Sequence, residues 1–271
     1  MSEPTSPFQT IGGLSLLMPA WPASDQIKAF CSTRSGGVSK TPFDSLNLGR
    51  YVNDEATAVS ENRARIRALL PAEPVWLKQV HGTRVWDADQ ALPEGVIEAD
   101  AAVTTNSNTV LTVMAADCLP VLITSSDGRV IGAAHAGWRG LLGGVLENTV
   151  DAMLAKAQER DASQYLAWLG PAIGPEAFEV GEEVLGAFMD YEQMHSLPSS
   201  AEAFVSVDGK PSKYRANLYQ LARQRLASKG LSQIYGGECC TVRDQSHFFS
   251  HRRDGQSGRF AAFIWRQSSG H

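Results

Sequence analysis

The stretch LPVLITSSDGRVIGAAHAG (residues 119–137) holds two apolar runs separated by the dipeptide Asp127-Gly128. Asp-Gly between apolar runs is a strong signal for the tight turn of a β-hairpin. We therefore expect an antiparallel pair of strands here. Cys118 directly precedes the first strand, and His135 lies near the end of the second. A cysteine and a histidine are unusual at these positions of core strands, so we expect functional residues at this end of the hairpin.

Other apolar runs of strand length are spread along the chain. They are AFCSTR (29–34), VWLKQVHG (75–82), VLTVMAAD (110–117), YLAWLGPA (165–172) and RFAAFIW (259–265). Segments with helical spacing lie between them, at 53–70, 140–160 and 216–230. In the last of these, Asn217 is placed to cap the start of the helix and Gly230 to close its end. The mixture predicts an α+β (mixed α/β) fold, with helices packed on a large sheet.

The domain organisation is expected to be simple, because the chain has no internal repeat and no low-complexity linker. A length of 271 residues fits one large domain or two small ones, and we expect a single domain over 1–271. The stretch with the weakest secondary-structure signal is 190–213. It is expected to be a surface excursion, that is, an irregular surface loop within that domain.

Composition excludes several classes of protein. Hydrophobic residues make up 43% and charged residues 20% of the chain, as in an ordinary globular protein. The net charge of −5, with no basic stripe, argues against nucleic-acid binding. No stretch approaches the ~20 apolar residues of a membrane helix, and the first residues lack the basic start of a secretion signal. We expect a cytoplasmic protein whose four cysteines are free thiols.

Three residues are candidate metal ligands, namely His81, Cys118 and His135. All three lie at or near the ends of predicted strands, which can converge on one rim of a sheet. Catalytic zinc is usually held by three protein ligands of this N, S, N type, with a fourth position open. The spacings match no zinc-finger pattern, so the alternative is a buried thiol with two hydrogen-bonded histidines.

Glycine-rich turns and carboxylates supply further candidates. In STRSGGVS (32–39), Arg34 and the backbone N–H groups freed by Gly36 and Gly37 could hold an oxyanion. The alternative is a simple strand-exit turn.

Beside His135, Trp138 and Arg139 could stack on a ring and bind an anion, although a tryptophan under a helix start is the commoner use. Asp100 and Asp117 could orient a metal-bound histidine or act as a base, or could cap a turn.

Taken in order, the motifs of the chain resemble those of the laccase-domain or YfiH-type family over about residues 12–267. The segments that carry the resemblance are STRSGGVS (32–39), FDSLNLG (43–49), ENRARIR (61–67), VWLKQVHG (75–82), ADAAVT (99–104), AADCLPVLI (115–123), HAGWRG (135–140), WLGPAIGPEAFEVG (168–181) and FFSHRRDGQSGR (248–259). The resemblance implies an α-β-β-α sandwich similar to the catalytic domain of bacterial deamidating toxins.

The resemblance also implies roles for particular residues. The family's metal site corresponds to His81, Cys118 and His135, and a phosphate- or substrate-handling arginine corresponds to Arg63. The other substrate- or phosphate-binding candidates that correspond to family positions are Arg34, Gly36, Gly37, Asn47, Arg252 and Arg253, and the residues beside His135 add Trp138 and Arg139. The catalytic candidates are Arg63, Cys118, Asp117 and Asp100.

The chain departs from the family pattern at two places. His251 stands where the family usually has tyrosine, and a second cysteine stands in GGECCT (236–241). If the side chain of residue 251 faces the pocket, we expect an altered substrate preference. We assign no function to the second cysteine.

The activity that the resemblance implies is zinc-dependent phosphorolysis of purine nucleosides (adenosine, inosine, guanosine and methylthioadenosine), with adenosine deamination as a side activity. The expected partners are a small-molecule nucleoside and phosphate, and the chain is expected to be a monomer. Copper is the alternative metal. The alternative functions are a copper-dependent polyphenol oxidase, which a chain with only six histidines disfavours, and a factor that edits peptidoglycan precursors.

Overall fold

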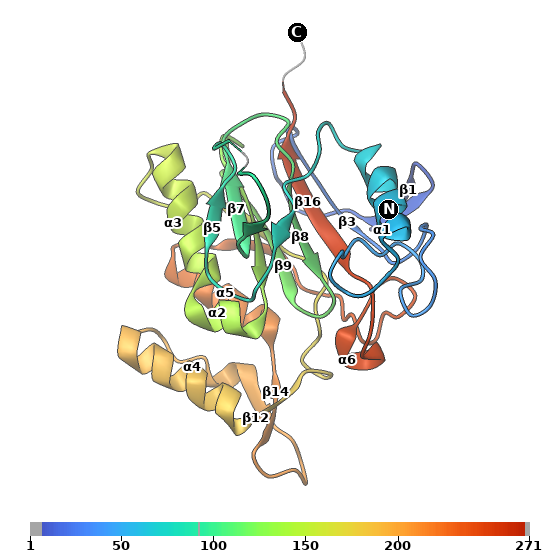
Figure 1. The fold of residues 1–271 in the computed structure, drawn as a ribbon. Helices are drawn as coiled ribbons and strands as arrows, with labels where there is room; N and C mark the ends of the chain where they lie inside the picture. Colours follow the sequence, from blue (N-terminus) through green and yellow to red (C-terminus); the bar gives the residue numbers. More distant parts are fainter. Residues whose placement is uncertain (1–6, 92, 269–271) are drawn as a thin grey trace, which may run out of the picture.

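Two β-sheets form the centre of the computed structural model, which describes residues 7–91 and 93–268 (Figure 1). The five-stranded sheet is antiparallel throughout, in the order β1 (Phe8–Ile11), β2 (Leu14–Leu17), β3 (Ile27–Ser32), β16 (Phe260–Arg266) and β8 (Leu111–Ala115). The six-stranded sheet is mixed, in the order β15 (Gln233–Gly236), β11 (Leu166–Leu169), β9 (Leu119–Thr124), β10 (Ile131–Ala136), β7 (Ala101–Thr104) and β5 (Val85–Asp87).

The hairpin predicted from Asp127-Gly128 is confirmed. Strands β9 and β10 pair antiparallel, with Thr124 opposite Ile131 and Pro120 opposite His135. Gly128 has φ +71°, a conformation that glycine adopts without steric cost. Every residue of both strands is buried, as expected for strands that are covered on both faces. The hairpin therefore lies at the centre of the six-stranded sheet.

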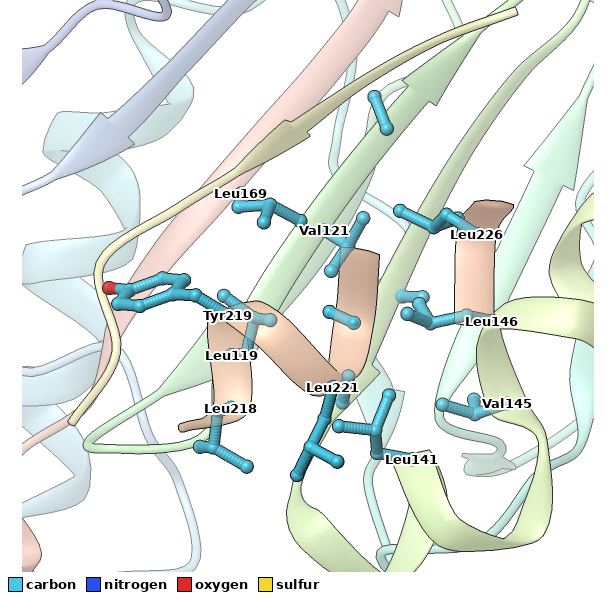
Figure 2. Packing of buried hydrophobic residues seen from close by; sticks show 14 of the residues in the cluster. Leu119, Val121, Leu141, Val145, Leu146, Leu169, Leu218, Tyr219, Leu221 and Leu226 are labelled. Atoms are coloured by element: carbon cyan, nitrogen blue, oxygen red, sulfur yellow. The ribbon is translucent and has the colours of Figure 1, made fainter. Parts of the chain in front are cut away.

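Helices cover the outer faces of the two sheets. On the six-stranded sheet, α2 (Trp138–Gly143), α3 (Val145–Ala157) and α5 (Leu218–Ser228) pack through an apolar cluster that includes Val121, Leu146 and Leu221 (Figure 2). On the five-stranded sheet, α1 (Ala56–Arg67) packs through Ile66 against residues such as Phe263. In Figure 1, α1 and α3 accordingly lie on opposite sides of the molecule.

The inner faces of the two sheets pack on each other. Val113 and Ile264 of the five-stranded sheet share a buried cluster with Leu122, Ala133 and Trp168 of the six-stranded sheet. The layers therefore run helix, sheet, sheet, helix, and the expectation of one large sheet is wrong. The mixed α/β class is confirmed, whereas the likeness to the toxin domain stays a prediction.

Helix boundaries differ from the sequence expectation at one important place. The helix expected over 140–160 begins two residues earlier and is broken into α2 and α3 at Gly144, whose φ is +94°. Trp138 and Arg139 are therefore the first residues of α2 and do not form a turn before it. The expected cap of α5 is confirmed, since the Asn217 side chain accepts a hydrogen bond from the backbone N–H of Gln220.

The stretch 190–213 has more structure than a surface excursion. It contains the end of α4 (Glu182–His195), the 3-10 turn η1 (Ala201–Ala203) and β13 (Phe204–Ser206). With β12 (Glu179–Gly181) and β14 (Lys213–Ala216), β13 forms a three-stranded antiparallel sheet. Glu192 is buried and accepts a hydrogen bond from the backbone N–H of Ser200, which fixes the chain after α4. This lobe lies below the sandwich in Figure 1.

Short elements position the remaining loops. The strand expected over 75–82 is reduced to β4 (Leu77–Lys78), which pairs in parallel with β6 (Ile97–Glu98). His81 lies beyond it in a loop, with φ +61°. Near the C-terminus, α6 (His251–Asp254) is a single turn capped by the Ser250 side chain. Among the described residues, no helix combines the length and the apolar character needed to span a membrane.

Candidate metal centre and active-site cavity

The three predicted metal ligands come together at one end of the hairpin. The ligand atoms of His81, Cys118 and His135 all lie within 4.8 Å of one another, and Cys118 Sγ is 3.6 Å from His81 Nε2. His81 comes from the loop after β4, and His135 from the end of β10. Cys118 lies on the link between β8 and β9, where the chain passes from one sheet to the other.

A buried carboxylate positions both histidines. Asp100 Oδ1 lies 2.9 Å from His135 Nδ1, which leaves Nε2 of that ring as the ligand atom. The same carboxylate accepts hydrogen bonds from the backbone N–H groups of Val80, His81 and Gly82, at 3.1, 2.9 and 2.7 Å. Metal-binding histidines commonly use their second nitrogen in this way, which fixes the tautomer and the ring orientation. Asp100 is therefore a positioning residue behind the cluster.

The charges of the cluster stabilise one another in the metal-free chain. Burial alone would raise the pKa of the Cys118 thiol, but His135 and His81 outweigh burial and hold this pKa below its ordinary value. Burial alone would lower the pKa of His135, but Cys118 and Asp100 outweigh it and raise this pKa. The thiolate, which is the form that binds metals, is thus favoured by its neighbours.

The donor set and the space around it fit a divalent metal ion. Two imidazoles and a thiolate, with a carboxylate behind one imidazole, are the ligands of a catalytic zinc site that keeps one position open. Gly137 completes the fit, because a Cβ atom at this position would lie 2.8 Å from His81 Cδ2 and 3.0 Å from Cys118 Sγ. Any larger residue would push the donor atoms apart.

A cavity of about 490 Å³ opens beside the cluster and has walls of two kinds. The residues that line it are Gly49, Arg50, Tyr51, Val52, Leu77, Gln79, His81, Met114, Ala115, Ala116, Asp117, Cys118, His135, Ile173, Phe178, His251, Arg252 and Arg259. An apolar surface, the apolar wall, is supplied by Leu77, Met114, Ile173 and Phe178. A cationic surface, the arginine wall, is supplied by Arg50, Arg252 and Arg259.

The carboxylate of Asp117 lines this cavity but is fully engaged. Its Oδ1 accepts a 2.6 Å hydrogen bond from the Thr241 hydroxyl, and its Oδ2 accepts one of 2.6 Å from the backbone N–H of Arg252. The residue itself has φ +93°. Asp117 therefore ties two loops to the link that carries Cys118, and the cavity has a net positive lining.

Of the other predicted substrate-binding residues, Arg252 and the departure His251 line the cavity. Arg252 Nη1 donates to the carbonyl oxygens of Glu179 at 3.0 Å and Ala177 at 3.4 Å, which holds the side chain along the rim. Arg253 instead points into its own loop, where it donates to the carbonyl oxygens of Thr241, Val242 and Phe248.

Arg63 lies outside the cavity lining. Its Nε donates to the carbonyl oxygen of Leu48 at 2.9 Å, and its guanidinium lies 3.7 Å from the ring centroid of Trp76. Burial, aided by the charge of Arg50, lowers the pKa of Arg63 to about 10. The structure thus gives Arg63 a packing role, and a direct role in phosphate binding stays a prediction.

The STRSGG turn also lies away from the cavity. Arg34 donates to the backbone and side chain of Asp44 at 2.9 and 3.1 Å. Gly36 has φ +97°, and a Cβ atom on Gly37 would lie 2.1 Å from the Ser45 carbonyl oxygen. The Gly37 N–H is bonded to the Ser45 hydroxyl. The glycines are therefore explained by close packing of the turn.

Asn47 acts indirectly on the cavity. It is wholly buried, and its Oδ1 accepts hydrogen bonds from the backbone N–H groups of Gly49 at 2.9 Å and Arg259 at 2.8 Å. It thereby positions two residues of the cavity wall. Trp138 and Arg139 do not line the cavity; Arg139 lies over the Trp138 ring at 4.3 Å, and Trp138 packs against the apolar core.

The sequence motifs do not single out Arg50, Tyr51, Gln79 or Phe178 of the cavity lining, and Arg259 enters them only as the last residue of FFSHRRDGQSGR (248–259). Each of these residues lies within or beside a segment that carries the family resemblance; Arg50 and Tyr51, for example, directly follow FDSLNLG (43–49). Nothing in the sequence distinguishes an arginine that faces the cavity from one that faces away.

Comparisons with known proteins find similar chains over nearly the whole length of this one. The family model described as multi-copper polyphenol oxidoreductase laccase matches residues 28–267. A purine nucleoside phosphorylase of Pseudomonas aeruginosa is 47% identical over 93% of this chain and 98% of its own length. The purine nucleoside phosphorylase YfiH of Escherichia coli is 48% identical over 92% of this chain and 98% of its own. The solved structure of a Neisseria meningitidis protein assigned to DUF152 superimposes with a TM-score of 0.85 at 43% identity, covering 93% of this chain and 99% of that one.

Proposed function

We propose that this chain, which belongs to the family described as multi-copper polyphenol oxidoreductase laccase, is a purine nucleoside phosphorylase that depends on a metal, with zinc as the resident ion. The observation that carries the proposal is the cavity in which the His81, Cys118 and His135 cluster adjoins both an apolar wall and an arginine wall. An aromatic base and an anionic co-substrate need these two surfaces side by side. The curated relatives carry the same name.

The reaction would transfer the ribosyl group of a purine nucleoside to phosphate. The N-glycosidic bond breaks, a C–O bond to phosphate forms, and the free base leaves with a proton. The transition state of such a cleavage resembles an oxocarbenium ion. Adenosine, inosine, guanosine and methylthioadenosine are the proposed substrates, since they share the purine ring and the ribosyl linkage.

The residues of the cavity divide this work between them. The apolar wall, with Phe178 and Ile173, would receive the purine ring and exclude water from the ribosyl carbon. The arginine wall would hold phosphate against that carbon. The two reactants would then react as bound neighbours, without having to meet by diffusion. A metal ion held by the cluster supplies Lewis-acid polarisation. Asp100 keeps the two histidines in place.

We propose adenosine deamination as a second activity at the same site, because a purine ring bound on the apolar wall would lie beside the metal cluster. Oxidation of phenols by a multicopper centre is disfavoured. Such a centre needs many imidazoles, and among the described residues the only group of at least three potential ligands close enough for one metal ion is His81, Cys118 and His135. A single copper in place of zinc stays the alternative for the metal.

The proposal also covers the domain organisation, the oligomeric state, the location and the partners of the chain. We propose one catalytic domain over residues 1–271 that acts as a monomer in the cytoplasm on small molecules, without nucleic acid as a partner. Among the described residues, the ligand candidates and the cavity lining supply the surfaces that this proposal requires.

The test is product analysis of inosine and adenosine after incubation with the zinc-loaded protein, with and without phosphate. We expect hypoxanthine from inosine, and adenine from adenosine, only when phosphate is present, and inosine from adenosine without it. Cys118→Ala should lose both bound zinc and turnover, while Cys239→Ala, which lies outside the cavity lining, should keep both. Full activity of zinc-free Cys118→Ala would refute the metal role.

A further inference from the structure

Of the three arginines that line the cavity, the motifs suggested Arg252 but not Arg50 or Arg259. We propose that Arg259, flanked by Arg50 and Arg252, is the anchor for the phosphate co-substrate. This inference rests on the phosphorylase activity proposed above and specifies where in the cavity the anion binds.

Arg259 is held from behind in a fixed orientation. Its Nη1 donates to the carbonyl oxygens of Ser257 at 2.8 Å and Gly258 at 2.9 Å. Its backbone N–H donates to Asn47 Oδ1 at 2.8 Å. Among the described residues, none accepts a hydrogen bond from Nε or Nη2 of Arg259, so these donors are left for a ligand. A guanidinium that is already oriented loses little entropy when it binds an oxyanion through two parallel hydrogen bonds.

The neighbouring backbone makes room for this arginine. A Cβ atom on Gly49 would lie 2.8 Å from Arg259 Cγ and 3.3 Å from Asn47 Oδ1. Glycine at position 49 therefore lets the loop 47–50 lie against the stem of Arg259. The buried Asn47 amide joins the two segments, which are 212 residues apart in the sequence. This arrangement places Arg50 and Arg259 on the same cavity wall.

The flanking arginines differ in how their side chains are held but add charge of the same sign. Arg252 is anchored through Nη1 to the Ala177 and Glu179 carbonyl oxygens. Arg50 is exposed at the cavity, and no hydrogen bond links its side chain to another described residue. The carboxylate of Asp117 is already shared by Thr241 and the Arg252 backbone. An anion entering the cavity therefore meets three guanidinium groups, whereas the one carboxylate of the lining, Asp117, already accepts two hydrogen bonds.

Two other arginines that the motifs suggested, Arg34 and Arg63, are less suited to this role. Arg34 is paired with Asp44, and Arg63 is stacked on Trp76 with its Nε bonded to Leu48. Neither lines the cavity. Arg63 adds positive potential close to Arg50, since burial and the charge of Arg50 lower the pKa of Arg63.

The experiment separates the two substrates kinetically, using the zinc-loaded full chain with inosine and inorganic phosphate. Arg259→Gln should raise the KM for phosphate at least about tenfold, because a charge-assisted hydrogen bond is lost, and should leave the KM for inosine within about twofold. Arg259→Lys, which keeps the charge but not the forked donors, should give a smaller rise. Arg50→Gln, an exposed change that cannot disturb the core, should raise the KM for phosphate about threefold.

Arg160→Gln is the matched control, because Arg160 is exposed and lies outside the cavity, so that the net charge changes equally. It should change neither KM. An unchanged KM for phosphate in both Arg259→Gln and Arg50→Gln would overturn the site, as would a rise confined to the KM for inosine.

Titration calorimetry with inorganic phosphate alone distinguishes this failure from that of the proposed function. If the wild-type chain binds phosphate, and Arg259→Gln does not, the anion site stands even where no phosphorolysis occurs. If both proteins bind phosphate equally, Arg259 is not the phosphate anchor, while the proposed phosphorylase function is unaffected.

Discussion

Asp100 Oδ1 and His135 Nδ1 lie 2.9 Å apart in the interior, and the same carboxylate accepts three backbone hydrogen bonds from the loop that carries His81. One side chain thus fixes two of the three candidate metal ligands. The third, Cys118, lies on the link between β8 and β9.

Asp100→Asn should weaken zinc binding by about 10- to 100-fold, the usual cost of losing the hydrogen-bond partner of a metal-binding histidine. The amide carries no charge and cannot accept hydrogen bonds through both of its terminal atoms. Competition with a chromogenic chelator measures the change. Asp190→Asn, on the exposed face of α4, is the control and should bind zinc as the wild type does. Equal affinities of the two variants would contradict the positioning role.

Gly137→Ala should reduce zinc binding without unfolding the chain. The new methyl group would lie 2.8 Å from His81 Cδ2 and 3.0 Å from Cys118 Sγ, so the donor atoms must separate. Zinc stoichiometry by atomic spectroscopy and thermal unfolding of the metal-free protein together check this. Gly186→Ala in α4, where no atom lies within 4 Å of the added Cβ, should leave zinc content unchanged. A fully loaded Gly137→Ala protein would show that the cluster tolerates the methyl group.

Cys118 of the metal-free protein should react with iodoacetamide at a lower pH than Cys239. Although burial raises the pKa of Cys118, its two histidine neighbours lower it overall, whereas burial and nearby carboxylates raise the pKa of Cys239 to about 11. Because the thiolate is the nucleophile, the rate at Cys118 should reach its plateau below the pH of about 8.5 at which an ordinary thiol is half ionised. Peptide mass spectrometry over a pH series measures both rates. A midpoint at or above that of an ordinary thiol would refute the charge coupling.

Asp89 should contribute to stability at neutral pH and lose that contribution in acid. Its burial raises the pKa, but Lys156, Thr104 and Thr105 outweigh burial and hold the pKa well below its usual range. A depressed native pKa means that the contribution is complete above the unfolded value of about 3.9 and disappears as the pH falls toward the native one.

The matching variant is Asp89→Asn, which should lower the free energy of unfolding by about 1–3 kcal/mol at pH 7. The gap to the wild type should shrink below a pH of about 4. Urea unfolding at pH 7 and pH 3 measures both effects. Asp25→Asn, at an exposed position, should cost little at either pH, and a gap that stays constant with pH would contradict the prediction.

The parts of the fold that the sequence predicts are those set by local signals. The Asp127-Gly128 turn and the Asn217 cap follow from backbone chemistry within a few residues, and both are confirmed. The hairpin of β1 and β2 carried a comparable signal in Gly12-Gly13, both with positive φ, but was not predicted. The division of the strands into two sheets depends on contacts across the whole chain, so periodicity alone could not show it.

The metal cluster was predictable because few residue types bind metals, and two of the three candidates flank one predicted hairpin. The arginines of the cavity were predictable only in part, because this chain has many arginines and a guanidinium lies far from its own backbone. Among the arginines that motif matching favoured, Arg252 lines the cavity, whereas Arg34, Arg63 and Arg253 do not. Arg50 and Arg259 line it as well but were not favoured by the motifs. Which arginine faces the cavity is decided by partners such as Leu48 for Arg63 and Ser257 for Arg259.

The position of Cys118 between the sheets has a consequence for heat tolerance. The three ligand atoms belong to a loop after β4, to the link from β8 to β9, and to the end of β10. An ion bound to all three would crosslink segments that are separate in the unfolded chain, much as a disulfide does. By mass action, free ion at 100 times its Kd would add about 2.7 kcal/mol to the unfolding free energy. Metal supply would then set the melting temperature of this protein as well as its activity.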